Sequence, residues 1–166
     1  MNLDEGKRQF IDSWGKLGIN WGVNKTMGQI HALLLIATRP LSCDDIMSEL
    51  SISRGNVNMN IRALIDWNLV QKEFLQGERR DYFVAEKDVF SMFKAVIEMR
   101  KKKELDPMLK VLGELSIVEA ECKDSQEFCR VVRDLTHFSK KADAALNNVT
   151  AAESNWLFGT FMKMMK

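Results

Sequence analysis

The sequence has few of the residues that build catalytic, metal or disulfide sites. Its 166 residues include three cysteines and two histidines. Cys43, Cys122 and Cys129 are odd in number and lack the spacing of a metal site, so we expect a reduced, cytoplasmic protein without a bound metal. His31 and His137 lie far apart, and the sequence contains no glycine-rich phosphate loop. We therefore expect no catalytic residues, no cofactor and no enzyme activity.

The chain also lacks a long apolar segment and an excess of either charge. No apolar run approaches the ~20 residues that span a bilayer, and no basic-then-apolar signal segment opens the chain, so we expect no membrane association. The net charge is +1, and residues 54–87 carry six basic against five acidic residues. Binding to a polyanion would therefore require positive charge concentrated on one face. With 46% hydrophobic residues, the chain can bury a substantial core.

Residues 41–66 form the most informative segment, and their pattern predicts a helix, a tight turn and a second helix. Ser42 can cap the first helix over residues 43–50, where two aspartates in the first turn suit the helix dipole. Ser53 can cap the second helix, residues 53–66. The apolar face of this second helix follows helical spacing and consists of Val57, Ile61, Leu64 and Ile65. A short capped helix followed by a second helix with one apolar face is the arrangement that helix-turn-helix proteins use to contact bases in the major groove.

The opposite face of the second helix is polar in an unusual way. Asparagine is a poor interior helix former, so three asparagines at alternating positions indicate side chains kept for another purpose. Asparagine can pair with adenine and arginine with guanine in the major groove. From this helix, the residues predicted to contact DNA are Ser53, Arg54, Gly55, Asn56, Asn58, Met59, Asn60 and Arg62.

Two predicted strands come after the second helix. Residues 69–76 and 80–85 are strand-like, and Gly77 in the turn between them permits a positive φ. Arg79 and Arg80 would project from the tip of this hairpin. An isolated hairpin of this kind is an ordinary turn with solvated charges. After a recognition helix it predicts a wing, residues 76–81, whose Gly77, Arg79 and Arg80 contact the DNA backbone or the minor groove.

These motifs together resemble the GbsR type of winged-helix regulators, which are relatives of the MarR family. The resemblance is carried by residues 53–64, 67–70 and 77–83, and residues 21–31 look like the family's entry into its DNA-binding domain. It departs at Asn58 and Asn68, where a small residue and a glycine are expected. The resemblance implies a fold that is mainly α with a small β-wing. It also implies a dimeric bacterial or archaeal transcriptional repressor that binds double-stranded DNA.

The chain is predicted to contain three segments. Residues 1–22 would form an N-terminal helix that takes part in dimerisation, residues 23–87 a winged helix-turn-helix domain that binds DNA, and residues 88–166 a helical dimerisation region. A homodimer suits the single short recognition helix, since a twofold pair reads a palindromic operator with half-sites one helical turn apart.

Details of the flanking helices are also predicted. Phe10, Ile11, Trp14 and Leu17 give an N-terminal helix over residues 4–18 one apolar face, and Gly15, Gly18 and Gly22 should loosen the segment that connects it to the next helix. Asn24 can cap that next helix, residues 25–38. After the wing, a helix capped by Asp88 should end at a break at residues 106–107. We expect further helices over residues 108–123, after residue 125, and around residues 156–165.

Several features have alternative interpretations. The rival to DNA binding is a winged-helix module for protein–protein interaction, although such a surface would favour exposed aromatics or leucines over arginine and asparagine. The basic run at residues 100–103 is either a solvated helix face or an additional phosphate contact. Methionines in the C-terminal helices either fill core gaps or form a dimer interface. His31 is expected to be a structural histidine whose polar atoms are satisfied within a helical core.

The resemblance also leaves room for a small-molecule effector. Relatives are implicated in sensing compatible-solute precursors such as choline, and aromatic side chains can surround a quaternary ammonium group through cation–π attraction. Trp14, Trp21 and Trp156 are the candidates. Tryptophans at helical spacing are more often ordinary core residues, so no ligand is assigned.

Overall fold

The computed structural model describes residues 1–20 and 22–151. The chain divides into two units, Met1–Met92 and Phe93–Lys166, the second described as far as Ala151. The elements of the first unit are α1 (Leu3–Asn20), α2 (Lys25–Ile36), β1 (Leu41–Ser42), α3 (Cys43–Leu50), α4 (Arg54–Asp66), β2 (Val70–Glu73) and β3 (Tyr82–Ala85). They are followed by α5 (Val89–Arg100), the π-helical segment η1 (Lys101–Leu105), α6 (Asp106–Leu115) and α7 (Lys123–Ala151). The helix predicted around residues 156–165 lies outside the described residues.

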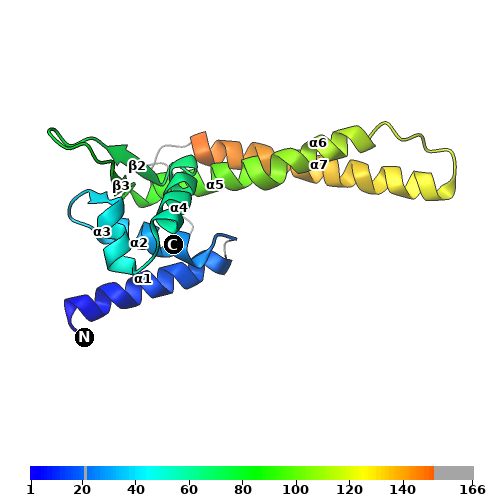
Figure 1. Ribbon diagram of the computed structural model, residues 1–166. Helices are drawn as coiled ribbons and strands as arrows, with labels where there is room; N and C mark the ends of the chain where they lie inside the picture. Colours follow the sequence, from blue (N-terminus) through cyan, green and yellow to red (C-terminus); the bar gives the residue numbers. More distant parts are fainter. Residues whose placement is uncertain (21, 152–166) are drawn as a thin grey trace, which may run out of the picture. The chain divides into compact units, whose positions relative to one another are not determined.

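The first unit is a winged helix, with three strands beside a helical core (Figure 1). The sheet is antiparallel with the order β1-β3-β2, and Phe83 of the middle strand faces Leu41 on one side and Lys72 on the other. The prediction of a mainly α fold with a small β-wing is confirmed. Strand β1 was not predicted, because two residues are too few to show an alternating pattern.

The core of this unit forms around α2, which contacts α1, α3, α4 and β3. Its Ile30 and Leu34 are essentially inaccessible, as is Ile46 of α3. Helix α4 contributes the predicted apolar residues Val57, Ile61 and Leu64, all at most 2% exposed. Burying each such side chain stabilises the fold by about 1.5–3 kcal/mol. The back of α4 is therefore anchored in the core, which leaves its opposite side to solvent.

Helix α1 packs against α2 through glycines, contrary to the prediction that Gly15 and Gly18 loosen the chain. Both glycines are buried within α1, and a Cβ on Gly28 of α2 would lie only 2.9 Å from the Cα of Gly15. The absence of side chains at this crossing lets the two backbones approach closely. Of the three predicted glycines, Gly22 lies in the turn between α1 and α2 and has a positive φ, +80°. The apolar face of α1 is incompletely covered, since Leu17 is 44% exposed.

In the second unit, the chain remains helical where a break was predicted at residues 106–107. Pro107 cannot donate a backbone hydrogen bond and would clash with the carbonyl four residues earlier in an α-helix. The wider π-helical turn of η1 precedes it, and the Asp106 N–H bonds to the Lys101 carbonyl. This local change of register accommodates the proline without ending the helix.

Helices α6 and α7 lie side by side in antiparallel orientation (Figure 1). The helix predicted over residues 108–123 ends at Leu115, where Ser116 bonds back to the carbonyls of Leu112 and Gly113. Two residues of the basic run are paired within the chain. Lys101 lies 3.1 Å from Asp106 and 2.9 Å from Asp143 of α7, and Arg100 lies 3.2 Å from Glu104. These ion pairs favour a structural role for both residues. No helix within the described ranges has the length and apolar character to cross a bilayer.

Candidate nucleic-acid interface

The two helices of the helix-turn-helix begin at the predicted caps. The Ser42 hydroxyl accepts a hydrogen bond from the Asp45 N–H while the Asp45 carboxylate accepts one from the Ser42 N–H, which forms a capping box. Arg39 lies 2.9 Å from Asp45, and its hydrogen bond is the main reason that the pKa of the Asp45 carboxyl is held below its ordinary value. Ser51 then turns the chain in a left-handed conformation, φ 52°. These contacts fix the direction in which α4 leaves the turn.

Helix α4 presents a polar surface opposite its buried face. Ser53 caps the helix by accepting a hydrogen bond from the Asn56 N–H at 3.3 Å. The side chain of Met59 is 60% exposed and that of Asn56 is half-buried. The remaining exposed members of the predicted DNA-contacting set on this helix are Arg54, Gly55, Asn58 and Arg62. The outer face of α4 is therefore accessible to a groove of DNA.

Asn60 is an exception, and its predicted contact with DNA is wrong. Its side chain is 1% exposed and lies between two other amides. The Asn60 Oδ1 accepts a hydrogen bond from Asn24 Nδ2 at 2.8 Å, and the Asn60 Nδ2 donates to Asn56 Oδ1 at 2.7 Å. Asn24 in turn caps α2 by accepting from the Met27 N–H. Three asparagines thus connect the start of α2 to the start of α4.

This amide chain leaves Asn56 with an available donor. Its Oδ1 accepts a hydrogen bond from Asn60, whereas its Nδ2 has no hydrogen-bond partner within the described residues. An amide oxygen has two lone pairs, so the Oδ1 can accept a second hydrogen bond as well. The Nδ2 therefore remains free to donate to a base acceptor, such as N7 or O6 of guanine. The sequence contains no signal for this amide chain, because Asn24 lies 32 residues before Asn56.

The predicted wing is a hairpin of β2 and β3. Val70 pairs with Ala85 and Glu73 with Tyr82, so the strands separate beyond residue 73. Gly77 has the predicted positive φ, 86°, and Arg79 and Arg80 are both exposed. Lys72 and Asp81 form an ion pair at 2.7 Å across the base of the loop. The hairpin is therefore confirmed, and its arginines are accessible as a wing contact would require.

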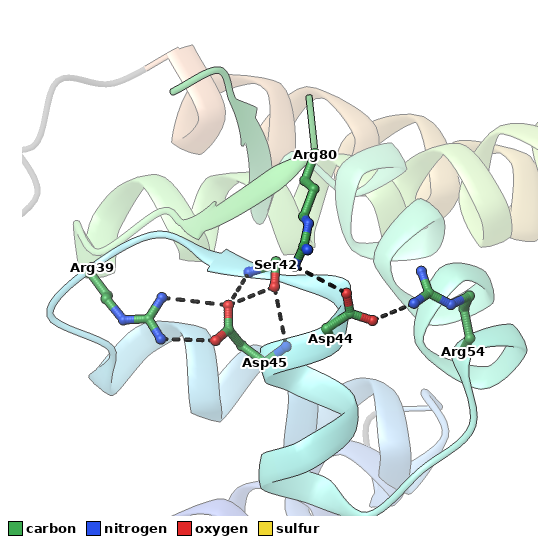
Figure 2. Close-up of polar contacts among 6 residues, drawn as sticks. All are labelled: Arg39, Ser42, Asp44, Asp45, Arg54 and Arg80. Carbon is green, nitrogen blue, oxygen red and sulfur yellow. Dashed lines mark hydrogen bonds and ion pairs between the residues drawn. The ribbon is translucent and has the colours of Figure 1, made fainter. Parts of the chain in front are cut away.

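One carboxylate joins the hairpin of β2 and β3 to helix α4. Asp44, in the first turn of α3, makes ion pairs with Arg54 of α4 and, at 3.4 Å, with Arg80 of the wing (Figure 2). The sequence suggested only that Asp44 suits the dipole of α3. Its two partners lie 10 and 36 residues away, so only the fold brings these three side chains together.

His31 and Trp14 meet between α1 and α2. The Trp14 indole N–H donates to His31 Nδ1 at 3.2 Å, and His31 is 6% exposed. Burial lowers the pKa of His31 to about 4. Its Nε2 has no hydrogen-bond partner within the described residues, so the prediction of a fully satisfied histidine is wrong for this atom. Trp14 belongs to the packing of α1 against α2, while Trp21 and Trp156 lie outside the described residues.

The sequence of the chain is similar to a family model and to several known proteins. A family model for the MarR family matches residues 21–81. HTH-type transcriptional repressor GbsR of Bacillus subtilis (strain 168) is 28% identical over 91 residues, which are 55% of this chain and 50% of that protein. The putative HTH-type transcriptional regulator YvaV of the same organism is 22% identical over 132 residues, 73% of this chain and 75% of that protein.

Among solved structures, the crystal structure of a transcriptional regulator superimposes with a TM-score of 0.60 at 21% identity. The match covers 89% of this chain and 99% of that one, and at this identity it supports the fold alone. With GbsR, the match extends over only half of the relative's length.

Proposed function

We propose that this chain is a sequence-specific DNA-binding transcriptional regulator of the GbsR type. The match of residues 21–81 to the MarR family model and the similarity to GbsR support this proposal. The chain acts as a homodimeric repressor. Helix α4 enters the major groove, and residues 76–81 of the wing contact the DNA backbone or the minor groove. The names of the relatives GbsR and YvaV support this assignment over a winged-helix module for protein docking.

The observation that carries the proposal is the two-sided character of α4. Its back is fixed by Val57, Ile61 and Leu64, which cannot leave the core without unfolding the unit. Its front carries exposed arginines and a half-buried asparagine with an available donor, which are groups that recognise base edges. The exposed arginines of the neighbouring hairpin can neutralise phosphates, which contributes affinity but no sequence information. A protein-docking surface would have a more apolar centre.

The dimer is supported by an apolar stripe on α7. Phe128, Val131, Leu135 and Phe138 recur at helical spacing and are 41%, 39%, 45% and 70% exposed, respectively. A contiguous exposed stripe of this kind on one helix is typical of an interface, and a second copy of the chain offers the same stripe in an isologous arrangement. We therefore keep residues 88–166 as the dimerisation region, with a contribution from residues 1–22.

The proposal is tested by a mobility-shift assay with the DNA upstream of the chain's own gene and a random duplex as competitor. We expect a shifted complex that survives an excess of random duplex, since specific binding typically exceeds non-specific binding by at least ~10³-fold. Equal competition by both duplexes would contradict sequence-specific binding. Failure to bind any duplex, even at low salt, would favour the protein-docking alternative.

A further inference from the structure

The first unit contains a pair of arginines that already hold an anion of the protein itself. Arg54 begins the recognition helix and Arg80 lies in the wing, yet both pair with the carboxylate of Asp44 (Figure 2). The side chains are 59%, 65% and 47% exposed, respectively, so this cluster lies at the surface. Two guanidinium groups converging on one anion is an arrangement that also suits a phosphate.

The fold explains why these three side chains converge. Ser42 pairs with Tyr82 across β1 and β3, which brings the start of α3 beside the end of the wing. Asp44 lies two residues after Ser42, and Arg80 lies two residues before Tyr82. On the other side, the short turn between α3 and α4 returns the chain so that Arg54 reaches the same carboxylate. The positive end of the α3 dipole also favours an anion at this position.

We propose that Arg54 and Arg80 form a binding site for a DNA backbone phosphate, and that Asp44 occupies this site in the free protein. This inference rests on the proposed DNA-binding function. Exposed ion pairs contribute little stability in water, so a phosphate can displace the carboxylate from both arginines. The displaced carboxylate then lies unpaired near the phosphate, which makes binding to every duplex weaker than the arginines alone would allow.

A carboxylate that competes with phosphate for the same arginines, as proposed for Asp44, limits non-specific binding to DNA. Phosphate contacts supply nearly all of the affinity for random DNA, and a genome offers a very large number of competing non-specific sites. Asp44 therefore keeps the free regulator from being retained by such sites. This role differs from that of a structural ion pair, because it predicts that loss of the carboxylate strengthens binding.

The test measures the affinity of full-length Asp44→Asn for a random duplex at several NaCl concentrations. We expect binding about fivefold tighter than wild type, comparable with the upper range for one exposed ion pair. The plot of log K against log salt should become steeper by about one, because the site then meets the same phosphate with one more unit of net positive charge. The matched control is Glu49→Gln, which removes an exposed carboxylate from the same helix that forms no ion pair with Arg54 or Arg80.

A mutant cycle separates the cluster from a general change of charge. The gain from Asp44→Asn should disappear in an Arg54→Gln/Arg80→Gln background. It should persist in an Arg79→Gln background, since the ion pairs of Asp44 within the described residues are with Arg54 and Arg80. Circular dichroism verifies folding, and Asp44→Ser replaces Asp44→Asn if the latter is unstable.

The outcomes distinguish the inference from the proposed function. If wild type binds DNA but Asp44→Asn binds no more tightly than Glu49→Gln, the phosphate site is wrong and the function stands. Weaker binding by folded Asp44→Asn would likewise overturn the inference and would assign Asp44 a purely positioning role. If wild type binds no duplex at low salt, both proposals fail.

Discussion

Asn56 combines a structural contact with a proposed contact to a base. Its oxygen accepts a hydrogen bond from Asn60, and its Nδ2 remains available as a donor to DNA. Asn56→Ala should weaken specific binding by about 1–3 kcal/mol, roughly 5- to 150-fold, with little effect on a random duplex. Asn56→Asp keeps an oxygen for Asn60 but lacks the donor, so it should lose specific binding at least as strongly. Competition mobility shifts measure both variants, and retention of specificity by Asn56→Asp would contradict the donor role.

His31 makes the stability of the first unit dependent on pH. Its pKa is about 4 in the folded protein against an ordinary value of 6.5, so the unfolded chain binds more protons between these values. Stability should therefore decrease by about 3 kcal/mol as the pH falls from 6.5 to 4. The carboxylates with lowered pKa, such as Asp45, lose their contribution mainly below this window.

Two histidine variants test this origin. His31→Gln removes the titrating group but can still accept from Trp14, so urea unfolding midpoints should become nearly independent of pH between 6.5 and 4. His137→Gln removes the exposed histidine of α7 and should retain the wild-type pH dependence. An unchanged pH dependence in His31→Gln would show that another group is responsible.

The side chains at helix starts were predictable, whereas those that meet across the fold were not. Ser42, Asn24 and Ser53 cap the helices as predicted, because a cap and its target N–H are within three residues. Asn60 has the same side chain as Asn56 and lies one helical turn away, yet it is buried. Its burial depends on Asn24, which lies 36 residues earlier, and no local pattern reports such a partner.

The crossing of α1 and α2 depends on the absence of two side chains. A Cβ on Gly28 would lie 2.9 Å from Gly15 Cα and 3.1 Å from the Trp14 carbonyl oxygen, and neither backbone atom can move alone. Gly28→Ala should therefore displace α1 and destabilise the first unit by about 1–3 kcal/mol. Gly6→Ala in α1 meets no atom within 4 Å and should instead stabilise by up to ~1 kcal/mol. Thermal unfolding monitored by circular dichroism compares the stability of the two variants. Equal changes in stability would contradict a close crossing of α1 and α2.

The helices and strands themselves were predictable from periodicity wherever they are amphipathic and bounded by strong signals. The back of α4 and the hairpin are examples, since apolar spacing and Gly77 are both local features. Pro107 predicted a helix end, because proline usually interrupts an α-helix. The prediction was wrong because no sequence pattern indicates the π-helical turn that accommodates this proline. The end of α6 was likewise missed, since apolar residues continue beyond Leu115 at helical spacing.

The near-neutral net charge of the protein is compatible with a DNA-binding surface because opposite charges are paired locally. The net charge is +1, yet the exposed arginines of α4 and the wing belong to one winged-helix unit. Asp44 pairs with two of these arginines, and in the proposed mechanism a DNA phosphate replaces its carboxylate. A count of charges over residues 54–87 could not reveal this arrangement, because Asp44 lies outside that range.

Dimerisation can be tested separately from DNA contact through α7. Phe138 is the most exposed apolar residue of the α7 stripe, so Phe138→Asp should place a charge in the proposed interface and yield monomers in sedimentation velocity. Because each monomer would then hold only one half-site, affinity for the operator should fall by about 10²-fold or more, and that for a random duplex much less. Ala144→Asp adds the same charge at an exposed position six residues further along α7 and should remain dimeric. Dimeric Phe138→Asp with unchanged operator affinity would place the interface elsewhere on the chain.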